Sequence, residues 1–201
     1  NMGMEQMFKL MNEARLLVGL QGLAGASAAV QNAWAYANER TQGSSSINPE
    51  KKVSIIEFPD VRRMLMHMKA VTEGLRALMY TTAWYIDMSN HGPEENREKY
   101  QDLLDLHIPI CKAFGTDQGF EVARIGIQIL GGVGFTKHFP LEQNIRDQKI
   151  GSIYEGTNGI QALDLVGRKF TSKKGALLKV LEKELRWFDN RSLEGELSGW
   201  V

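Results

Sequence analysis

The sequence predicts an all-α fold, an antiparallel four-helix bundle with an additional C-terminal helix. Apolar residues recur every three or four positions over long stretches, and no stretch has the apolar–polar alternation of a half-buried strand. Four of the five prolines, at positions 49, 59, 93 and 140, lie between these stretches. With 201 residues, 43% of them hydrophobic and 24% charged, the chain has the size and composition of a globular domain with its own core.

The first predicted helix covers residues 2–40, a segment without proline. Apolar side chains from Phe8 to Ala37 recur at helical spacing, and about 35 helical residues would span about 50 Å. Residues without a bulky side chain allow a neighbouring helix or a ligand to approach the backbone closely. We interpret them as a helix-packing face and keep ligand contact as the alternative. These small residues are Gly19, Gly22, Ala24, Gly25, Ala26, Ala28 and Ala29.

Two more long helices follow a turn-rich break over residues 43–49. The second helix is predicted to begin at Pro59, a residue suited to the first helical position, and to run to about residue 90. The third is predicted from about residue 94 to residue 130, and Pro109 is expected to kink it or to divide it in two.

The remaining segments complete the predicted bundle. A glycine-rich turn over residues 131–134 ends the third helix, and a short polar segment reaches about residue 149. A fourth long helix is predicted over residues 157–170 and the additional C-terminal helix over residues 173–188.

Composition excludes several classes of function. Lys and Arg total 24, as do Asp and Glu, so the chain lacks the basic excess of a nucleic-acid-binding protein. A single cysteine, Cys111, excludes an internal disulfide and a cysteine-rich zinc site, and the four histidines have no metal-ligand spacing. No apolar run reaches the roughly 18 residues of a membrane span. We expect no metal and a reducing, cytoplasmic compartment. We also expect a piece of a longer protein, since the chain opens Asn1-Met2-Gly3.

Glu155 is the most informative candidate for chemistry. It precedes Gly156, which leaves room for a ligand, and Thr157 or Asn158 can cap the helix that follows. A carboxylate in such a loop is well placed to act on a substrate. The alternative is structural, because acidic residues are favoured near the start of a helix.

Two arginines and a glycine turn are weaker candidates. Arg15 lies within the first helix and Arg40 near its end, and each could bind a phosphate or carboxylate through its planar guanidinium group. Taken alone, each is also consistent with an exposed or salt-bridged surface residue. The Gly-Gly-x-Gly turn from Gly131 to Gly134 closes a helix, so it is not a Rossmann fingerprint. It is either a glycine C-cap or a backbone surface that a cofactor can approach.

Four motifs together resemble the C-terminal helical domain of acyl-CoA dehydrogenases. Residues 153–161 (IYEGTNGIQ) are similar to the family's C-terminal signature, and residues 146–150 (RDQKI) precede it in the same order. Residues 128–135 (QILGGVGF) resemble its flavin-contacting turn. Residues 11–15 (MNEAR), with Glu39-Arg40 further on, resemble the start and end of the first helix of that domain. The segment from Glu57 to Met64 is most similar to the larger bacterial subgroup that includes methylmercaptopropionyl-CoA dehydrogenases.

The resemblance implies a FAD-dependent oxidoreductase that makes a trans-2,3 double bond in an acyl-CoA thioester. Glu155 matches the family's base, which removes the α-proton while FAD accepts a hydride from Cβ. Gly156 matches a residue that lines the thioester. Thr157, Asn158 and Gly159 match residues that contact the flavin.

The resemblance also assigns two further groups of residues. Asn12 and Arg15 match the segment that contacts the CoA portion of the substrate. The other group matches residues that bind the FAD of a neighbouring subunit, which implies a homodimer or homotetramer. That group is Arg40, Gln128, Ile129, Leu130, Gly131 and Gly132.

The resemblance covers the third domain of such an enzyme. Residues 1–170 correspond to the C-terminal helical domain and residues 171–201 to an extension, while the family's N-terminal helical and middle β domains lie outside this chain. The implied partners are an acyl-CoA substrate and an electron-transfer acceptor protein, and the isolated domain is expected to be inactive. Two alternatives stay open: a non-catalytic helical interaction domain, and an acyl-CoA oxidase-like enzyme.

Overall fold

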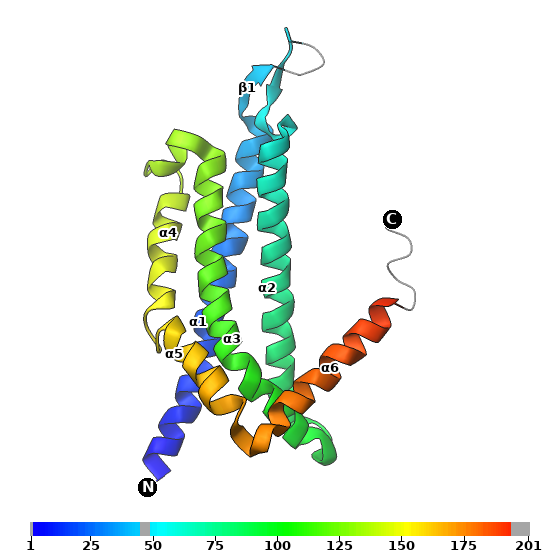
Figure 1. Ribbon diagram of the computed structural model, residues 1–201. Coiled ribbons are helices and arrows are strands. Elements are labelled where there is room, and N and C mark those ends of the chain that lie inside the picture. The colour runs from blue at the N-terminus through cyan, green and yellow to red at the C-terminus, as the bar shows by residue number, and fades with distance from the viewer. Residues whose placement is uncertain (1, 45–48, 194–201) are drawn as a thin grey trace.

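The computed structural model describes residues 2–44 and 49–193 and confirms the all-α fold. Helices α1 (Met2–Glu39), α2 (Pro59–His91) and α3 (Glu94–Leu130) form the body of the bundle. Figure 1 shows them running alternately up and down, with α4 (Leu141–Lys149) descending beside α3. The second and third helices begin and end within a residue or two of the predicted positions, because proline and glycine mark both boundaries.

The fourth position of the bundle is filled by α4 and not by the helix predicted over residues 157–170. That segment is divided into α5 (Asn158–Leu163) and a π-helical turn (Asp164–Lys169), and both lie at one end of the bundle in Figure 1. Helix α4 was not predicted because residues 141–149 are mostly polar. Only Leu141 and Gln148 of this helix are buried. A short helix at the edge of a bundle needs few apolar residues.

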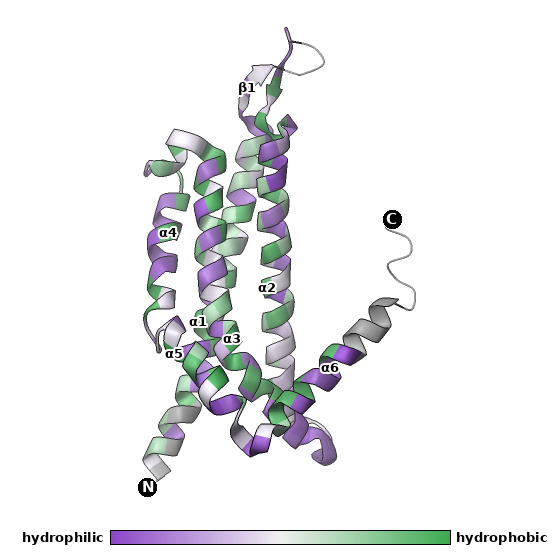
Figure 2. Ribbon diagram, in the orientation of Figure 1, coloured by the Kyte–Doolittle hydropathy of each residue, from purple (hydrophilic) through white to green (hydrophobic). Residues whose placement is uncertain are grey.

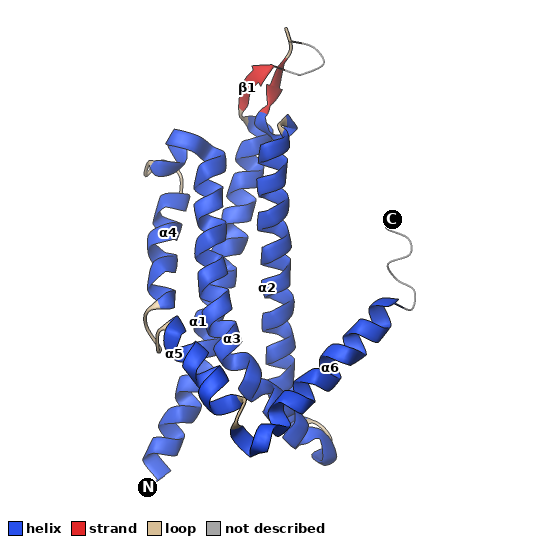
Figure 3. Cartoon of the chain, in the orientation of Figure 1, coloured by secondary structure: helices blue, strands red, loops and turns tan. Residues whose placement is uncertain are grey.

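The break between α1 and α2 contains a short hairpin that the sequence analysis did not predict. Strands β1 (Thr41–Ser44) and β2 (Lys52–Ser54) pair antiparallel, with Thr41 opposite Ser54. In Figure 3 the two strands of this hairpin are drawn in red, and they lie beyond one end of the helical bundle. Most of its residues are polar and exposed, and Val53 alone among them is a large apolar residue, so it has no period-two pattern of apolar residues to detect.

Small residues bring α1 and α3 into backbone contact, which confirms the helix-packing interpretation of this face. A Cβ atom added to Gly22 would lie 2.1 Å from the carbonyl oxygen of Gly115, and one added to Gly19 would lie 2.5 Å from that of Cys111. Gly119 approaches Gly22 equally closely. No larger side chain fits at this crossing, so the two helices are held in one register.

The core lies between α1, α2 and α3. Leu23, Leu65, Met68, Leu75 and Val122 are among its enclosed side chains. Hydrophobic and hydrophilic residues alternate along α2 and α3, whereas α1 is pale over much of its length because of its alanines and glycines (Figure 2). Pro109 is buried within α3, which continues through it as one helix.

The additional C-terminal helix, α6 (Ala176–Leu193), leaves the bundle at an angle (Figure 1). Its predicted span of 173–188 began too early, because Lys173 and Lys174 have left-handed backbone angles before the helix. Part of the predicted extension, residues 194–201, lies outside the described residues.

Candidate functional site

The loop between α4 and α5 presents Glu155 in an uncommon backbone conformation. Glu155 has φ 54° and Gly156 has φ 83°, both in the left-handed region that non-glycine residues rarely adopt. Glu155 is half-buried, and within the described part of the chain no hydrogen bond or ion pair engages its carboxylate. A strained residue with an unpartnered carboxylate is typical of a functional position.

The chain on both sides of Glu155 is fixed by hydrogen bonds. Gln161, which is 1% exposed, donates from Nε2 to the carbonyl oxygens of Gly156 (3.1 Å) and Glu155 (3.4 Å). Tyr154 donates its hydroxyl to Oε1 of Gln21 on α1. The side chain of Thr157 caps α5 by accepting from the backbone N–H of Ile160 at 3.3 Å. The capping role therefore belongs to Thr157 and leaves Glu155 free.

Asn158, the first residue of α5, is turned into the bundle. Its Nδ2 donates to Oδ1 of Asp117 (2.8 Å) and to Oγ1 of Thr116 (3.0 Å), and its Oδ1 accepts from Nζ of Lys112 (2.8 Å). The side-chain amide is fully used by α3. Any flavin contact from Asn158 would be made by its backbone.

Arg15 is buried beside the same loop. It is 5% exposed, its Nη1 lies 3.4 Å from Oδ2 of Asp164, and Asn12 accepts a second hydrogen bond from it at 3.4 Å. Its Nη2 would lie 3.8 Å from a Cβ atom on Gly156. The interpretation of Arg15 as a surface residue is wrong. The guanidinium group belongs to the interior of this end of the bundle.

Two polar atoms at this end have no partner among the described residues, Nε of Arg15 and Oε1 of Gln161. Buried polar atoms are normally hydrogen-bonded, so an unpartnered pair beside the Glu155 loop fits a site that receives a polar group from a substrate. The loop itself offers exposed Thr157 and Gly159 to a ligand.

The second predicted group of residues gathers at the opposite end of the bundle. Arg40 and Gln128 are exposed and line a groove of about 380 Å³ between the hairpin, α2 and the end of α3. Ile129 and Leu130 are buried, at 5% and 3% exposure, so they reach this groove mainly through their backbone. Gly131 lies beside them at the groove's edge.

The glycine turn at this end is a C-cap that also leaves its backbone accessible. The N–H of Gly131 bonds the carbonyl oxygens of Gln128 and Ile127, and its backbone angles (φ 66°, ψ −146°) are essentially restricted to glycine. Cβ atoms added to Gly131 or Gly132 would meet no atom within 4 Å. An exposed cation, an amide and an open glycine backbone form a donor set that suits a dinucleotide phosphate.

The two groups of residues are too far apart to serve the same atoms. Lys112, which contacts Asn158, and Gln128 are 16 residues apart on α3, which corresponds to about 24 Å. The structure thus unites Glu155, Gly156, Asn12 and Arg15 at one end. It unites Arg40 with the 128–132 turn at the other.

Sequence reasoning missed Lys112, Gln161 and Asp164 as members of the Glu155 end. Lys112 gave a detectable signal, because it follows Ile108 and precedes Thr116 at four-residue spacing on the buried face of α3. Gln161 stands at the end of the 153–161 motif, and its side chain bonds the Glu155 and Gly156 carbonyl oxygens only because the loop folds back on itself. Asp164 gave no signal, since its partner Arg15 lies 149 positions away.

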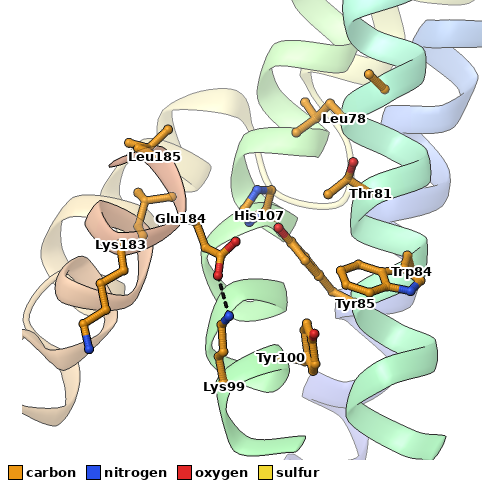
Figure 4. Close-up of a pocket in the computed structure, with 12 residues that line it drawn as sticks. Leu78, Thr81, Trp84, Tyr85, Lys99, Tyr100, His107, Lys183, Glu184 and Leu185 are labelled. Atoms are coloured by element: carbon orange, nitrogen blue, oxygen red, sulfur yellow. Dashed lines mark ion pairs between the residues drawn. The ribbon is translucent and has the colours of Figure 1, made fainter. Parts of the chain in front are cut away.

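A third hollow, of about 750 Å³, lies between α2, α3 and α6 and contains none of the predicted site residues. Figure 4 shows Trp84, Tyr85 and Tyr100 around it, and an ion pair of 2.5 Å between Lys99 and Glu184 joins α3 to α6. Burial lowers the pKa of His107 and raises the pKa of Tyr85 in this hollow.

Other features of the described residues concern metals and membranes. No group of three or more His, Cys, Asp or Glu residues is arranged to hold a metal ion within the described ranges. No helix in these ranges combines the length and apolar character needed to cross a bilayer. Cys111 is enclosed by the core, and burial raises its thiol pKa to about 11, so it is not poised as a nucleophile.

Comparison with known proteins places residues 1–170 in the family described as acyl-CoA dehydrogenase, C-terminal domain. The chain is 42% identical over 199 residues to a 3-methylmercaptopropionyl-CoA dehydrogenase of Ruegeria pomeroyi, which covers 98% of this chain and 33% of that protein. It is 43% identical over 179 residues to a butyryl-CoA dehydrogenase of Syntrophomonas wolfei, covering 88% and 29%. The chain thus spans about a third of the length of these relatives.

Solved structures share the fold. Butyryl-CoA dehydrogenase from Megasphaera elsdenii matches with a TM-score of 0.67 at 27% identity, over 83% of this chain and 38% of that one. Caenorhabditis elegans ACDH-11, solved with C11-CoA, matches with a TM-score of 0.79 at 21% identity, over 92% and 29%.

Proposed function

The chain belongs to the acyl-CoA dehydrogenase family, and from this premise we propose that it supplies the general base of a FAD-dependent enzyme that desaturates an acyl-CoA thioester. The observation that carries the proposal is Glu155: a half-buried carboxylate without a partner in the described chain, in a left-handed loop fixed on both sides. A general base needs a free lone pair and a defined position, and this residue has both.

The reaction divides into two transfers that together remove two hydrogens and leave a trans-2,3 double bond. The carboxylate of Glu155 takes the proton from the α-carbon. A bound FAD would supply the acceptor for the hydride that leaves Cβ. Gly156 lets the thioester approach the loop, and Arg15 beside it orients the loop or the substrate through its buried guanidinium group.

The opposite end of the bundle serves a different copy of the cofactor. Arg40, the amide of Gln128 and the open backbone of Gly131 and Gly132 suit the pyrophosphate of FAD. Their separation of about 24 Å from the Glu155 end supports binding to the FAD of a neighbouring subunit, and thus a homodimer or homotetramer.

The complete protein would then act on an acyl-CoA substrate, pass its electrons to an electron-transfer acceptor protein and work in the cytoplasm. Residues 1–170 form the catalytic helical domain and residues 171–201 an extension. The domain by itself would lack much of the flavin and substrate site and would be inactive.

The test is Glu155→Gln in the complete, FAD-loaded protein, with Glu94→Gln on the exposed start of α3 as control. The amide preserves the size of the side chain but cannot accept the α-proton. We expect anaerobic reduction of the flavin by acyl-CoA to slow by about 10²–10⁴-fold while flavin content per chain is unchanged. The control should behave like the unmodified protein.

Near-normal flavin reduction in Glu155→Gln would show that the base lies elsewhere. Loss of flavin with normal reduction per bound flavin would assign Glu155 a structural role. Rapid reoxidation of the reduced flavin by oxygen would instead favour the oxidase-like alternative.

A further inference from the structure

Lys112 is an unusual residue for the interior of a helical bundle. Its side chain is 0% exposed, in the middle of α3, on the face that packs toward α5. A lysine is almost never fully buried without a dedicated partner, because removing the ammonium group from water is costly. Burial is accordingly the main reason that its pKa is lowered.

The nearest partner of the buried ammonium group is the residue that anchors the Glu155 loop. Nζ of Lys112 donates to Oδ1 of Asn158 at 2.8 Å, and Asn158 stands three positions after Glu155. The opposite side of the same amide donates to Oδ1 of Asp117 at 2.8 Å. Lys112 and Asp117 thus hold the two ends of the Asn158 amide in one orientation.

The charged groups that face Lys112 come from three elements. Asp117 lies on α3, Arg15 on α1 and Glu155 in the loop before α5. Arg15 pairs with Asp164 on the π-helical turn, a carboxylate that Arg168 also engages, at 2.6 Å. Glu155 is therefore the carboxylate near Lys112 that has no partner of its own in the described chain.

We propose that Lys112 is a positioning residue for the general base: its ammonium group fixes Asn158, and through Asn158 it holds the loop that presents the Glu155 carboxylate. The inference rests on the proposed function of Glu155 and extends it to a residue that does not touch the substrate. A hydrogen bond alone could come from a neutral side chain. The buried ammonium group instead makes a charge-assisted hydrogen bond to Asn158, which is stronger than a bond from a neutral donor.

The experiment compares Lys112→Met with Lys69→Met in the complete, FAD-loaded protein. Methionine fills similar space without charge, so the core should stay packed and the melting temperature should not fall. Lys69 is exposed on α2 and pairs only with Glu73 among the described residues, which makes its replacement a matched control for loss of a lysine charge. The readouts are flavin content, kcat, KM and hydrogen–deuterium exchange of backbone amides over residues 150–160.

For Lys112→Met we expect kcat to fall about tenfold to a hundredfold, because a small misplacement of a catalytic group has effects of that size. KM should stay within about threefold and flavin content should be unchanged. Exchange over residues 150–160 should rise about tenfold, and the Lys69→Met control should change none of these quantities. Unchanged exchange, or an unchanged kcat, would overturn the role.

A double-variant cycle separates action through Asn158 from a general loss of packing. If Lys112 acts through Asn158, the Lys112→Met, Asn158→Ala double variant should have the same kcat as Asn158→Ala alone. Additive losses would overturn the proposed route. Exchange is measured without substrate, so its outcome is independent of the proposed chemistry. Normal flavin reduction by the Glu155→Gln variant would contradict the proposed function. Unchanged hydrogen–deuterium exchange in the Lys112→Met variant would contradict the positioning role.

Discussion

The two ends of the bundle use polar residues in opposite ways. At the Glu155 end, Arg15 and Lys112 are buried and Asn158 is half-buried, and their charged and amide groups have partners from other elements. At the hairpin end, Arg40 and Gln128 are exposed beside an open glycine turn. The fold thus fixes the polar groups of the Glu155 end and leaves those of the hairpin end accessible to a ligand.

This difference indicates that the two ends of the bundle have different roles. A network of buried hydrogen bonds between helices fixes side-chain positions, which a catalytic residue requires. Exposed groups at a helix end with open backbone can be completed by a ligand or by another subunit. Stability should therefore depend on the Glu155 end, and ligand retention on the hairpin end.

The largest expected effect on stability is at the buried ion pair of the Glu155 end. Asp164→Asn leaves the guanidinium group of Arg15 buried without an anion, and we expect the free energy of unfolding to fall by about 3 kcal/mol. Denaturant unfolding of the complete protein measures it. Glu182→Gln, which breaks the exposed pair with Arg186, is the control and should cost no more than about 0.5 kcal/mol. Equal effects of the two variants would contradict the comparison between buried and exposed polar groups.

At the hairpin end the expected effect is on the cofactor. Arg40→Ala should weaken FAD retention about tenfold by removing a charge-assisted contact, while the free energy of unfolding of the apoprotein stays within about 0.5 kcal/mol. Flavin content after dilution and dialysis measures retention. Arg63→Ala, an exposed arginine on α2 paired with Asp60, serves as the control. Full flavin retention in Arg40→Ala would show that the hairpin end of the bundle does not bind the cofactor.

The smallest expected effects come from a pair of backbone substitutions, one at each end. Gly131→Ala should destabilise by about 1 kcal/mol, since its conformation excludes a side chain although the space is open. Glu155→Gly should stabilise by about 1 kcal/mol, because it relieves a left-handed non-glycine residue, while activity is lost. Both shifts are read from denaturant midpoints. A destabilised Glu155→Gly would mean that the Glu155 side chain contributes packing that exceeds its backbone strain.

Much of the fold was predictable because local signals determine it. Pro59, Pro93 and Gly131 mark the boundaries of α2 and α3, since proline and glycine restrict or permit particular backbone angles wherever they occur. The hairpin and α4 were missed because they bury few apolar residues and so leave no periodic pattern. The family resemblance was also available from sequence, and the comparisons confirm it.

The site was predictable only in part. Glu155 and Gly156 stand in a recognisable motif, yet Lys112 lies 43 positions earlier and Asp164 lies 149 positions from its partner Arg15. Sequence spacing carries no information about such pairs until the helices are packed.

The sequence by itself determined the helical class and the boundaries of α2 and α3, because these depend on residue types within a few positions of one another. It also named the candidate base, through the resemblance of residues 153–161 to a family motif. Only the tertiary structure decided that Arg15 is buried, that Asn158 faces inward and that Arg40 lies at the far end from Glu155. The physical reason is that burial and charge pairing are properties of the space between helices. That space is created when Gly19 and Gly22 bring α1 against α3.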